Sequence, residues 1–149
     1  MEDVSGLFEK GGAVMWPIVA LSSLGLAIAF ERFIAFARFF RGGDTRPGES
    51  PQRRLNRLQR GFGLLSTIIT AEPMLGILGT VTGIIRTFAA FDAASGSPVA
   101  ATAGIGEALI TTAAGLVAAL VLIFPYNALL GLLSRAAERL EEQDEEETP

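Results

Sequence analysis

Long uncharged apolar runs are the feature that most constrains how this chain can fold. The first run covers residues 13–30, and a helix of that length extends about 27 Å, close to the thickness of the hydrocarbon core of a bilayer. Two longer runs cover about residues 62–93 and 101–133, and half of the 149 residues are hydrophobic. We therefore predict an all-α membrane protein with three transmembrane helices.

Turn residues and charges divide the chain between these runs. Gly96, Ser97 and Pro98 favour a tight turn, so the long second and third helices are predicted to form an antiparallel hairpin. Glu72 and Pro73 interrupt the second run, where we expect a kink or a membrane boundary. The predicted parts are an extracytoplasmic segment at 1–12, a transmembrane helix at 13–37, a short basic cytoplasmic loop at 38–61, a long transmembrane helix at 62–93, an extracytoplasmic turn at 94–100, a long transmembrane helix at 101–135, and an acidic cytoplasmic tail at 136–149.

The distribution of arginine predicts the orientation. Residues 38–60 contain seven Arg against Asp44 and Glu49, whereas residues 1–12 and the turn are weakly acidic. Because basic loops stay in the cytoplasm, the N-terminus is predicted outside and the C-terminus inside. The acidic N-terminus argues against a cleaved signal peptide, so we expect the first helix to remain as an anchor. The arginines of an amphipathic lead-in at residues 51–62 either face water or contact anionic membrane lipids.

The missing residue types exclude several kinds of chemistry. The chain contains no Cys and no His, which excludes a thiol nucleophile, a disulfide and a His-based metal site. The usual general acid–base residue is absent as well. We therefore predict that the chain is not an enzyme, holds no metal or cofactor, and has no nucleic-acid partner.

Small residues form a stripe along each of the two long helices. Gly76, Thr80, Gly83 and Thr87 share one face of the second long run, and the third run repeats the spacing. Such stripes let helix backbones approach closely in a membrane. We predict that they pack helices together in an oligomer, although ordinary packing within one chain would use the same pattern. The predicted packing residues are Gly76, Gly79, Gly83, Ala108, Gly115 and Ala119.

Two charges lie within these apolar helices at similar depth. Arg86 and Glu107 each fall six or seven residues inside the turn, about 9–10 Å below the outer helix ends. A charge in hydrocarbon costs about 2.5–3.5 kcal/mol even on the mildest scale, and such residues often mark an ion path. Thr80, Thr111 and Thr112 form a hydroxyl layer deeper in the membrane. The two charges either belong to an ion path with these threonines or pair only to hold the hairpin together.

Two blocks of sequence resemble a known family. Residues 72–88 read EPMLGILGTVTGIIRTF and residues 104–127 read GIGEALITTAAGLVAALVLIFPYN. In this order, they resemble the MotA/TolQ/ExbB proton channel family, and the TolQ/ExbB branch most closely. The resemblance covers about half of the chain, as in a short member of that family. It implies a homopentameric ring in a bacterial-type inner membrane, with the second and third helices around a central pore.

The resemblance also implies partners and a role. Two copies of a single-span ExbD/TolR-like partner would insert into the pore and carry the key proton-binding Asp, and a TonB/TolA-like effector would receive the motion. Thr80, Glu107 and Thr112 would be the pore-facing polar residues of this chain. Proton flow would then drive the inner dimer against the outer ring and power work at the cell envelope.

The chain departs from the family pattern at several positions. Glu72 stands where the family usually has Ala. Arg86 places a positive charge in a path for cations, and Glu107 must neutralise that charge. Pro125 replaces an earlier proline, and the cytoplasmic loop is shorter than usual.

The sequence leaves three alternatives to a proton channel of this branch. A MotA-like stator is disfavoured, because it has four spans and a large cytoplasmic domain. A sodium-driven motor of the same family would use the same hydroxyl layer. A non-conducting oligomeric membrane scaffold would share every feature except the need for Glu107 and the threonines.

Overall fold

The computed structural model describes residues 12–42, 49–93 and 98–147. Within these ranges the chain forms helices and no strand: α2 (Met15–Phe40), α3 (Pro51–Gln59), α4 (Phe62–Ala93) and α5 (Pro98–Glu147). Three helical segments are long and apolar enough to cross a membrane. The predicted all-α class with three candidate spans is therefore confirmed.

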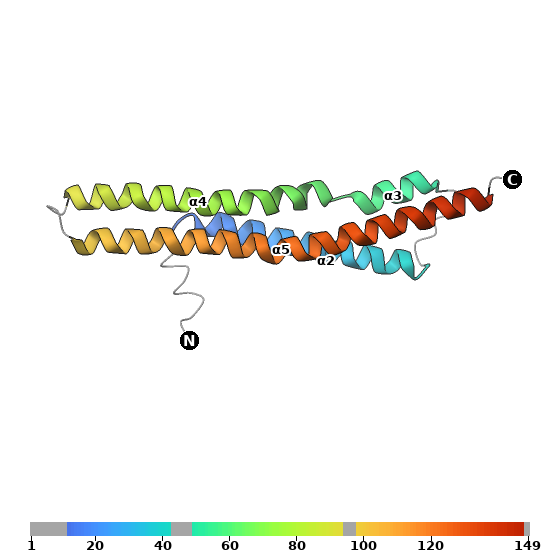
Figure 1. The fold of residues 1–149 in the computed structure, drawn as a ribbon, viewed down its shortest axis with the longest axis horizontal. Helices are drawn as coiled ribbons and strands as arrows, with labels where there is room; N and C mark the ends of the chain where they lie inside the picture. Colours follow the sequence, from blue (N-terminus) through green and yellow to red (C-terminus); the bar gives the residue numbers. More distant parts are fainter. Residues whose placement is uncertain (1–11, 43–48, 94–97, 148–149) are drawn as a thin grey trace.

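The helices lie roughly parallel to one long axis. Figure 1 shows α4 and α5 side by side along most of the molecule, with α2 against only part of their length. We call the end where α4 finishes and α5 begins the turn end, and the opposite end the α3 end. At the turn end, α4 and α5 extend beyond the start of α2. The start of α2 therefore provides a second marker of depth along the α4–α5 pair.

A glycine separates α3 from α4. Gly61 has a φ of +84°, in the left-handed region that glycine adopts without strain. A Cβ at this position would lie 3.2 Å from Ile28 Cγ2, so the break packs closely against α2. Arg32 Nη1 on α2 donates to the carbonyl oxygen of Arg57 at 3.1 Å. The contact ties α3 to the second half of α2.

The apolar core lies toward the α3 end, where all four helices meet. Phe36 of α2 packs edge-on against Phe62 at the start of α4, with ring centroids 6.3 Å apart, and Phe62 also contacts Tyr126 of α5. Leu58 attaches α3 to this core, as expected for an amphipathic helix. The other buried members are Ala29, Phe39, Leu65, Ile68, Leu122, Leu129, Ala136 and Leu140.

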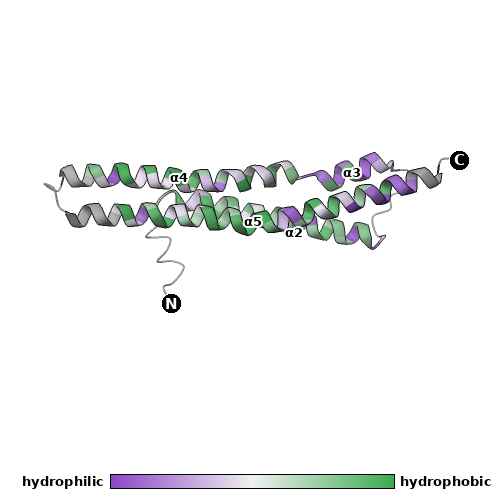
Figure 2. Cartoon of the chain, in the orientation of Figure 1, coloured by the Kyte–Doolittle hydropathy of each residue, from purple (hydrophilic) through white to green (hydrophobic). Residues whose placement is uncertain are grey.

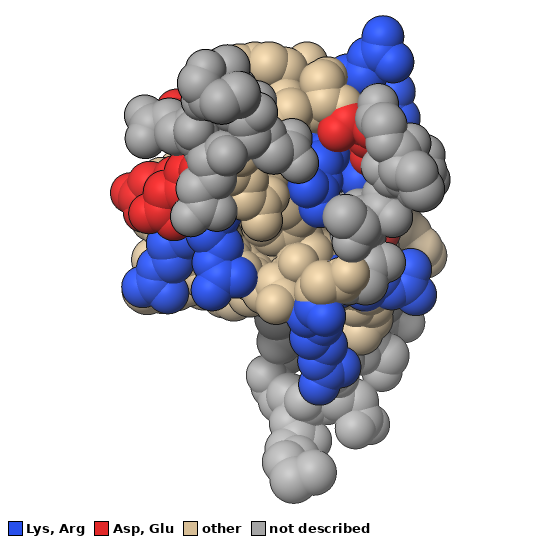
Figure 3. Space-filling view, turned by 90° about the vertical axis from the view of Figure 1, so that its right-hand side faces the viewer, with Lys and Arg blue, Asp and Glu red and all other residues tan. Residues whose placement is uncertain are grey.

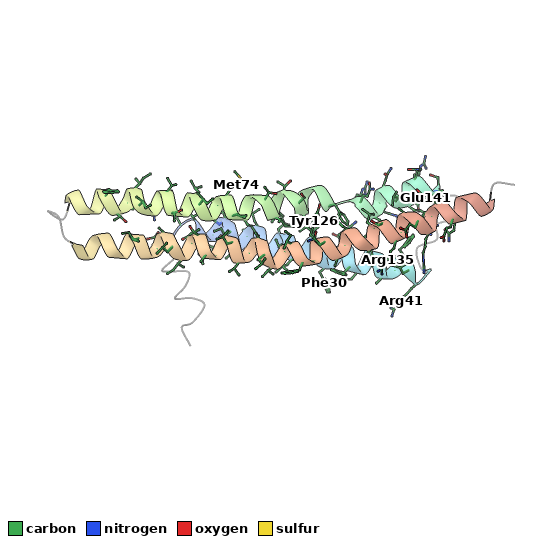
Figure 4. The ribbon with its side chains drawn as sticks, in the orientation of Figure 1. Phe30, Arg41, Met74, Tyr126, Arg135 and Glu141 are labelled. Atoms are coloured by element: carbon green, nitrogen blue, oxygen red, sulfur yellow. The ribbon has the colours of Figure 1, made fainter. Side chains whose placement is uncertain are left out.

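Polar residues concentrate at the α3 end, whereas the rest of the surface is apolar. Figure 2 shows hydrophilic residues on α3 and on the last turns of α5, and Figure 3 shows Lys and Arg side chains around that end of the molecule. Large apolar side chains elsewhere point outward, including Phe30 and Met74 in Figure 4. A surface of this kind suits lipid or other helices rather than water.

Candidate functional site

Small residues bring the backbones of α4 and α5 into direct contact. A Cβ at Gly76 would lie 3.1 Å from the carbonyl oxygen of Thr112, and one at Gly83 would lie 2.7 Å from the Cβ of Ala108. One at Gly115 would lie 2.5 Å from the carbonyl oxygen of Glu72. The methyl group of Thr111 on α5 occupies the space beside Gly79. Most of the predicted packing residues therefore form a contact within one chain, Ala119 lies partly buried on α5, and a role between copies stays a prediction.

Thr80 and Thr112 form a hydroxyl pair across this contact. Thr112 Oγ1 donates to the carbonyl oxygen of Gly76 at 2.8 Å and lies 3.3 Å from Thr80 Oγ1. Thr80 Oγ1 donates to the carbonyl oxygen of Ile77 at 2.6 Å. Both side chains are partly exposed. With their hydrogens directed to carbonyls, the two oxygens offer lone pairs to water or a cation at the surface.

Thr111 has a different environment from its neighbour. Its side chain is 1% exposed, its methyl packs against Gly79, and its hydroxyl donates to the carbonyl oxygen of Glu107 at 2.9 Å. Threonine commonly satisfies its hydroxyl in this way on its own helix. In the single chain Thr111 is therefore a packing residue, and its predicted place in an ion path stays untested.

Arg86 and Glu107 form the predicted ion pair. Arg86 Nη1 donates to Glu107 Oε1 at 3.0 Å, and the side chains are 58% and 30% exposed. Gly12, with a φ of +67°, lies directly against the Glu107 carboxylate, where any Cβ would overlap the carboxylate oxygen. The start of α2 therefore lies at the level of this pair.

The ion pair and the hydroxyl pair lie on opposite sides of the α4–α5 contact. Glu107 and Thr112 are five residues apart, which separates them by about 140° around α5. Arg86 and Thr80 are six residues apart, about 120° around α4. The ion pair lies on the same side of the contact as α2, because Gly12, which precedes α2, touches Glu107. The hydroxyl pair lies on the side that α2 leaves uncovered.

Sequence reasoning missed one carboxyl group at this site. The sequence marks Glu72 only as an interruption of the second apolar run and a departure from the family pattern, yet its side chain is 0% exposed. Ser22 Oγ of α2 lies 2.7 Å from Glu72 Oε1. The missed signal was its spacing, because Glu72, Gly76, Gly79 and Gly83 follow one another at i, i+4, i+7 and i+11. Glu72 therefore continues the face that meets α5.

The sequence of the chain is similar to those of known proteins. The model of the MotA/TolQ/ExbB proton channel family matches residues 48–142, more than half of the chain. A putative biopolymer transport protein ExbB-like 1 of Synechocystis is 33% identical over 180 residues, covering 86% of this chain and 71% of that protein.

Two further relatives match a smaller part of the chain. A putative ExbB homolog of Methanothermobacter thermautotrophicus is 40% identical over 58% of this chain and 31% of its own length. The Tol-Pal system protein TolQ of Haemophilus influenzae is 38% identical over 52% of this chain and 34% of its own length. The chain thus spans about a third of these two relatives. No solved structure matches it.

Proposed function

Because the chain belongs to the MotA/TolQ/ExbB proton channel family, we propose that it is a proton-channel subunit of an envelope motor. Its relatives carry the names of biopolymer transport and Tol-Pal system proteins. The chain would form a ring, pentameric by resemblance, in an inner membrane with its N-terminus outside. Single-span partners of the ExbD/TolR type would occupy the ring and carry the protonated Asp. The ring would convert the proton motive force into work on a TonB/TolA-like effector.

The observation that carries this proposal is the Thr80–Thr112 hydroxyl pair on the uncovered face of α4 and α5. Its oxygens lie 3.3 Å apart, amid exposed apolar residues such as Ile77, Val81 and Leu116. Polar groups in such a surface belong in a protein interior or a water-filled path rather than against lipid. A ring that turns this face toward its axis would place the hydroxyls in the lumen.

The ion pair supports the same proposal from the other side of the contact. Arg86 and Glu107 are both accessible and lie near the turn end of the path. Because Glu107 neutralises Arg86, the paired arginine repels a passing proton less strongly than an unpaired one would. We propose that this pair forms the entrance and that the hydroxyl pair follows it about 7–9 Å further along the helices.

Proton uptake by vesicles tests the proposal. The chain is co-reconstituted with a single-span partner of the ExbD/TolR type, and an internal pH dye records acidification under an imposed gradient. Thr80→Val and Glu107→Gln are expected to assemble normally and to reduce proton uptake by about tenfold or more, because each removes a polar group from the path. Thr82→Val is the matched control, since Thr82 donates only to the carbonyls of its own helix.

The result also separates the two other candidate roles. If the wild-type complex acidified the vesicles no faster than empty vesicles, the channel would be refuted and a non-conducting scaffold would remain. Normal uptake in both variants would refute the places given to Thr80 and Glu107 in the path. No acidification under a pH gradient, together with sodium entry recorded by an internal sodium dye under a sodium gradient, would identify a sodium-driven member.

A further inference from the structure

Glu72 is an isolated acid sealed inside one chain. Its side chain is fully buried where α2, α4 and α5 meet, because Ser22 contacts its carboxyl and Gly115 contacts its backbone. Its second oxygen, Oε2, has no hydrogen-bond partner among the described residues. Because the group is 0% exposed in the single chain, no group from another protein can reach it unless α2 moves away.

The hydrogen count at Ser22 indicates which form of Glu72 occupies this site. Ser22 Oγ lies 2.8 Å from the carbonyl oxygen of Ile18 and 2.7 Å from Glu72 Oε1. A hydroxyl has one hydrogen, so it can donate to only one of these two oxygens. Both contacts become hydrogen bonds if Ser22 donates to Ile18 and a protonated Glu72 donates to Ser22. An ionised Glu72 would instead have one donor at most.

No cation neutralises Glu72 in the part of the chain that the structure describes. Along α2 the nearest ionisable groups are Glu31 and Arg32, about 13–15 Å from Ser22. Along α4 they are Arg60 and Arg86, about 18–21 Å away. The described residues contain no acidic cluster that could hold a metal ion.

On α5 the nearest charged groups are also remote. Glu107 is about 12 Å from Gly115, the residue opposite Glu72, and Arg135 is about 30 Å from it. Buried charges in proteins are normally paired or bound to metal. The neutral form of Glu72 is therefore the form that this environment accommodates.

The position of α2 places this acid near the middle of the membrane. Gly12 lies beside Glu107, and Arg32 lies beside the Gly61 break, so this part of α2 runs along α4 from about Arg86 to Gly61. Ser22 and Glu72 each lie close to the midpoint of their own stretch. Water, which could otherwise solvate a carboxylate, is scarcest at that depth.

We propose that Glu72 is a proton-binding site, held as a neutral carboxylic acid whose hydrogen bond to Ser22 joins α2 to the α4–α5 pair. The site lies apart from the Thr80–Thr112 pair, so it binds a proton inside the protomer rather than along the proposed path. The inference concerns the isolated chain in lipid and does not depend on proton conduction.

Infrared spectroscopy of the full chain in vesicles of ether lipids, which have no ester C=O stretch to overlap that of a carboxylic acid, tests this site. The C=O stretch of a protonated carboxylic acid is separate from the two bands of a carboxylate. At neutral pH the wild-type protein is expected to show a protonated-acid band that disappears in Glu72→Gln. Glutamine is the matched replacement, because its NH₂ can donate to Ser22 as the acid does. Glu107→Gln is the control and should retain the band.

A second variant keeps the test decisive if Glu72→Gln does not fold. Ser22→Ala removes the acceptor of the acid's hydrogen bond, so the band is expected to remain and to shift in frequency. A band that survives in Glu72→Gln, the absence of any such band at neutral pH, or a band unmoved by Ser22→Ala would each overturn the proposal. Because no transport is measured, none of these results depends on whether the ring conducts protons.

Discussion

Replacing Gly115 with Ala tests whether close backbone contact between α4 and α5 stabilises this protein. The new Cβ would lie 2.5 Å from the carbonyl oxygen of Glu72 and 2.9 Å from the Cα of Gly76. These neighbours are backbone atoms, so no side-chain rotation relieves the overlap. Because ordinary contact begins at 3.4 Å, α4 must move away by about 0.9 Å.

The energetic cost follows from that displacement. A gap of 0.5–1 Å loses about a quarter to a half of the dispersion attraction across it, and packing is a main force between helices in a membrane. Overpacking typically costs about 1–3 kcal/mol, whereas exchanging Gly for Ala in a helix returns about 0.5–1 kcal/mol. We expect Gly115→Ala to lower the free energy of unfolding by about 1–2 kcal/mol, a factor of roughly 5–30 in the folded-to-unfolded ratio.

Gly131→Ala provides the matched control on the same helix. A Cβ at Gly131 has no neighbour within 4 Å, so only the gain in helix propensity remains. Unfolding of both variants in detergent, followed by circular dichroism during an SDS titration, measures the difference. If Gly115→Ala proved as stable as Gly131→Ala, α4 and α5 would not depend on this approach and the packing argument would be wrong.

Two further substitutions test contacts of α2 and of the ion pair. Gly25→Ala should destabilise the chain, because its Cβ would lie 2.6 Å from Leu122 Cδ1. Leu122→Ala alone should lower the free energy of unfolding by about 2–5 kcal/mol. The double variant should be more stable than the sum of the two single losses predicts. Additive losses in the same unfolding assay would contradict this contact. A double-mutant cycle of Arg86→Gln and Glu107→Gln should give a coupling below about 1 kcal/mol that falls with added salt, because both side chains are exposed; a larger, salt-independent coupling would mean that the pair is shielded from water.

Local patterns in the sequence predict the helices and part of the site. Turn residues and the length of the apolar run mark a helix at 62–93, and α4 occupies those residues. Equal spacing from the turn predicts that Arg86 and Glu107 meet, and they do. Both inferences succeed for the same reason. They depend only on the rise of a helix and on a short connection, so no knowledge of distant contacts is needed.

Contacts of α2 could not be predicted in the same way. Ser22 and Glu72 are 50 residues apart, and their meeting depends on the depth and rotation at which α2 packs against the other helices. Neither quantity is encoded by periodicity within α2, whose surface is apolar on nearly all sides. The break at Gly61 also helps to set this register, because it lets α3 turn and contact Arg32.

The three polar sets differ in access, and this difference constrains how the protein can handle protons. Arg86 and Glu107 are open to solvent at the start of α2, the Thr80–Thr112 pair is partly open on the face without α2, and Glu72 is closed. Arg86 and Glu107 can be reached from the α2 side of the α4–α5 contact. A proton moving along the uncovered face can meet the Thr80–Thr112 pair without any change in the fold. It can reach Glu72 only if α2 separates from α4 and α5. Any link between Glu72 and transport would therefore have to act through movement of α2, and a disulfide that holds α2 in place would abolish that link while leaving the path itself open.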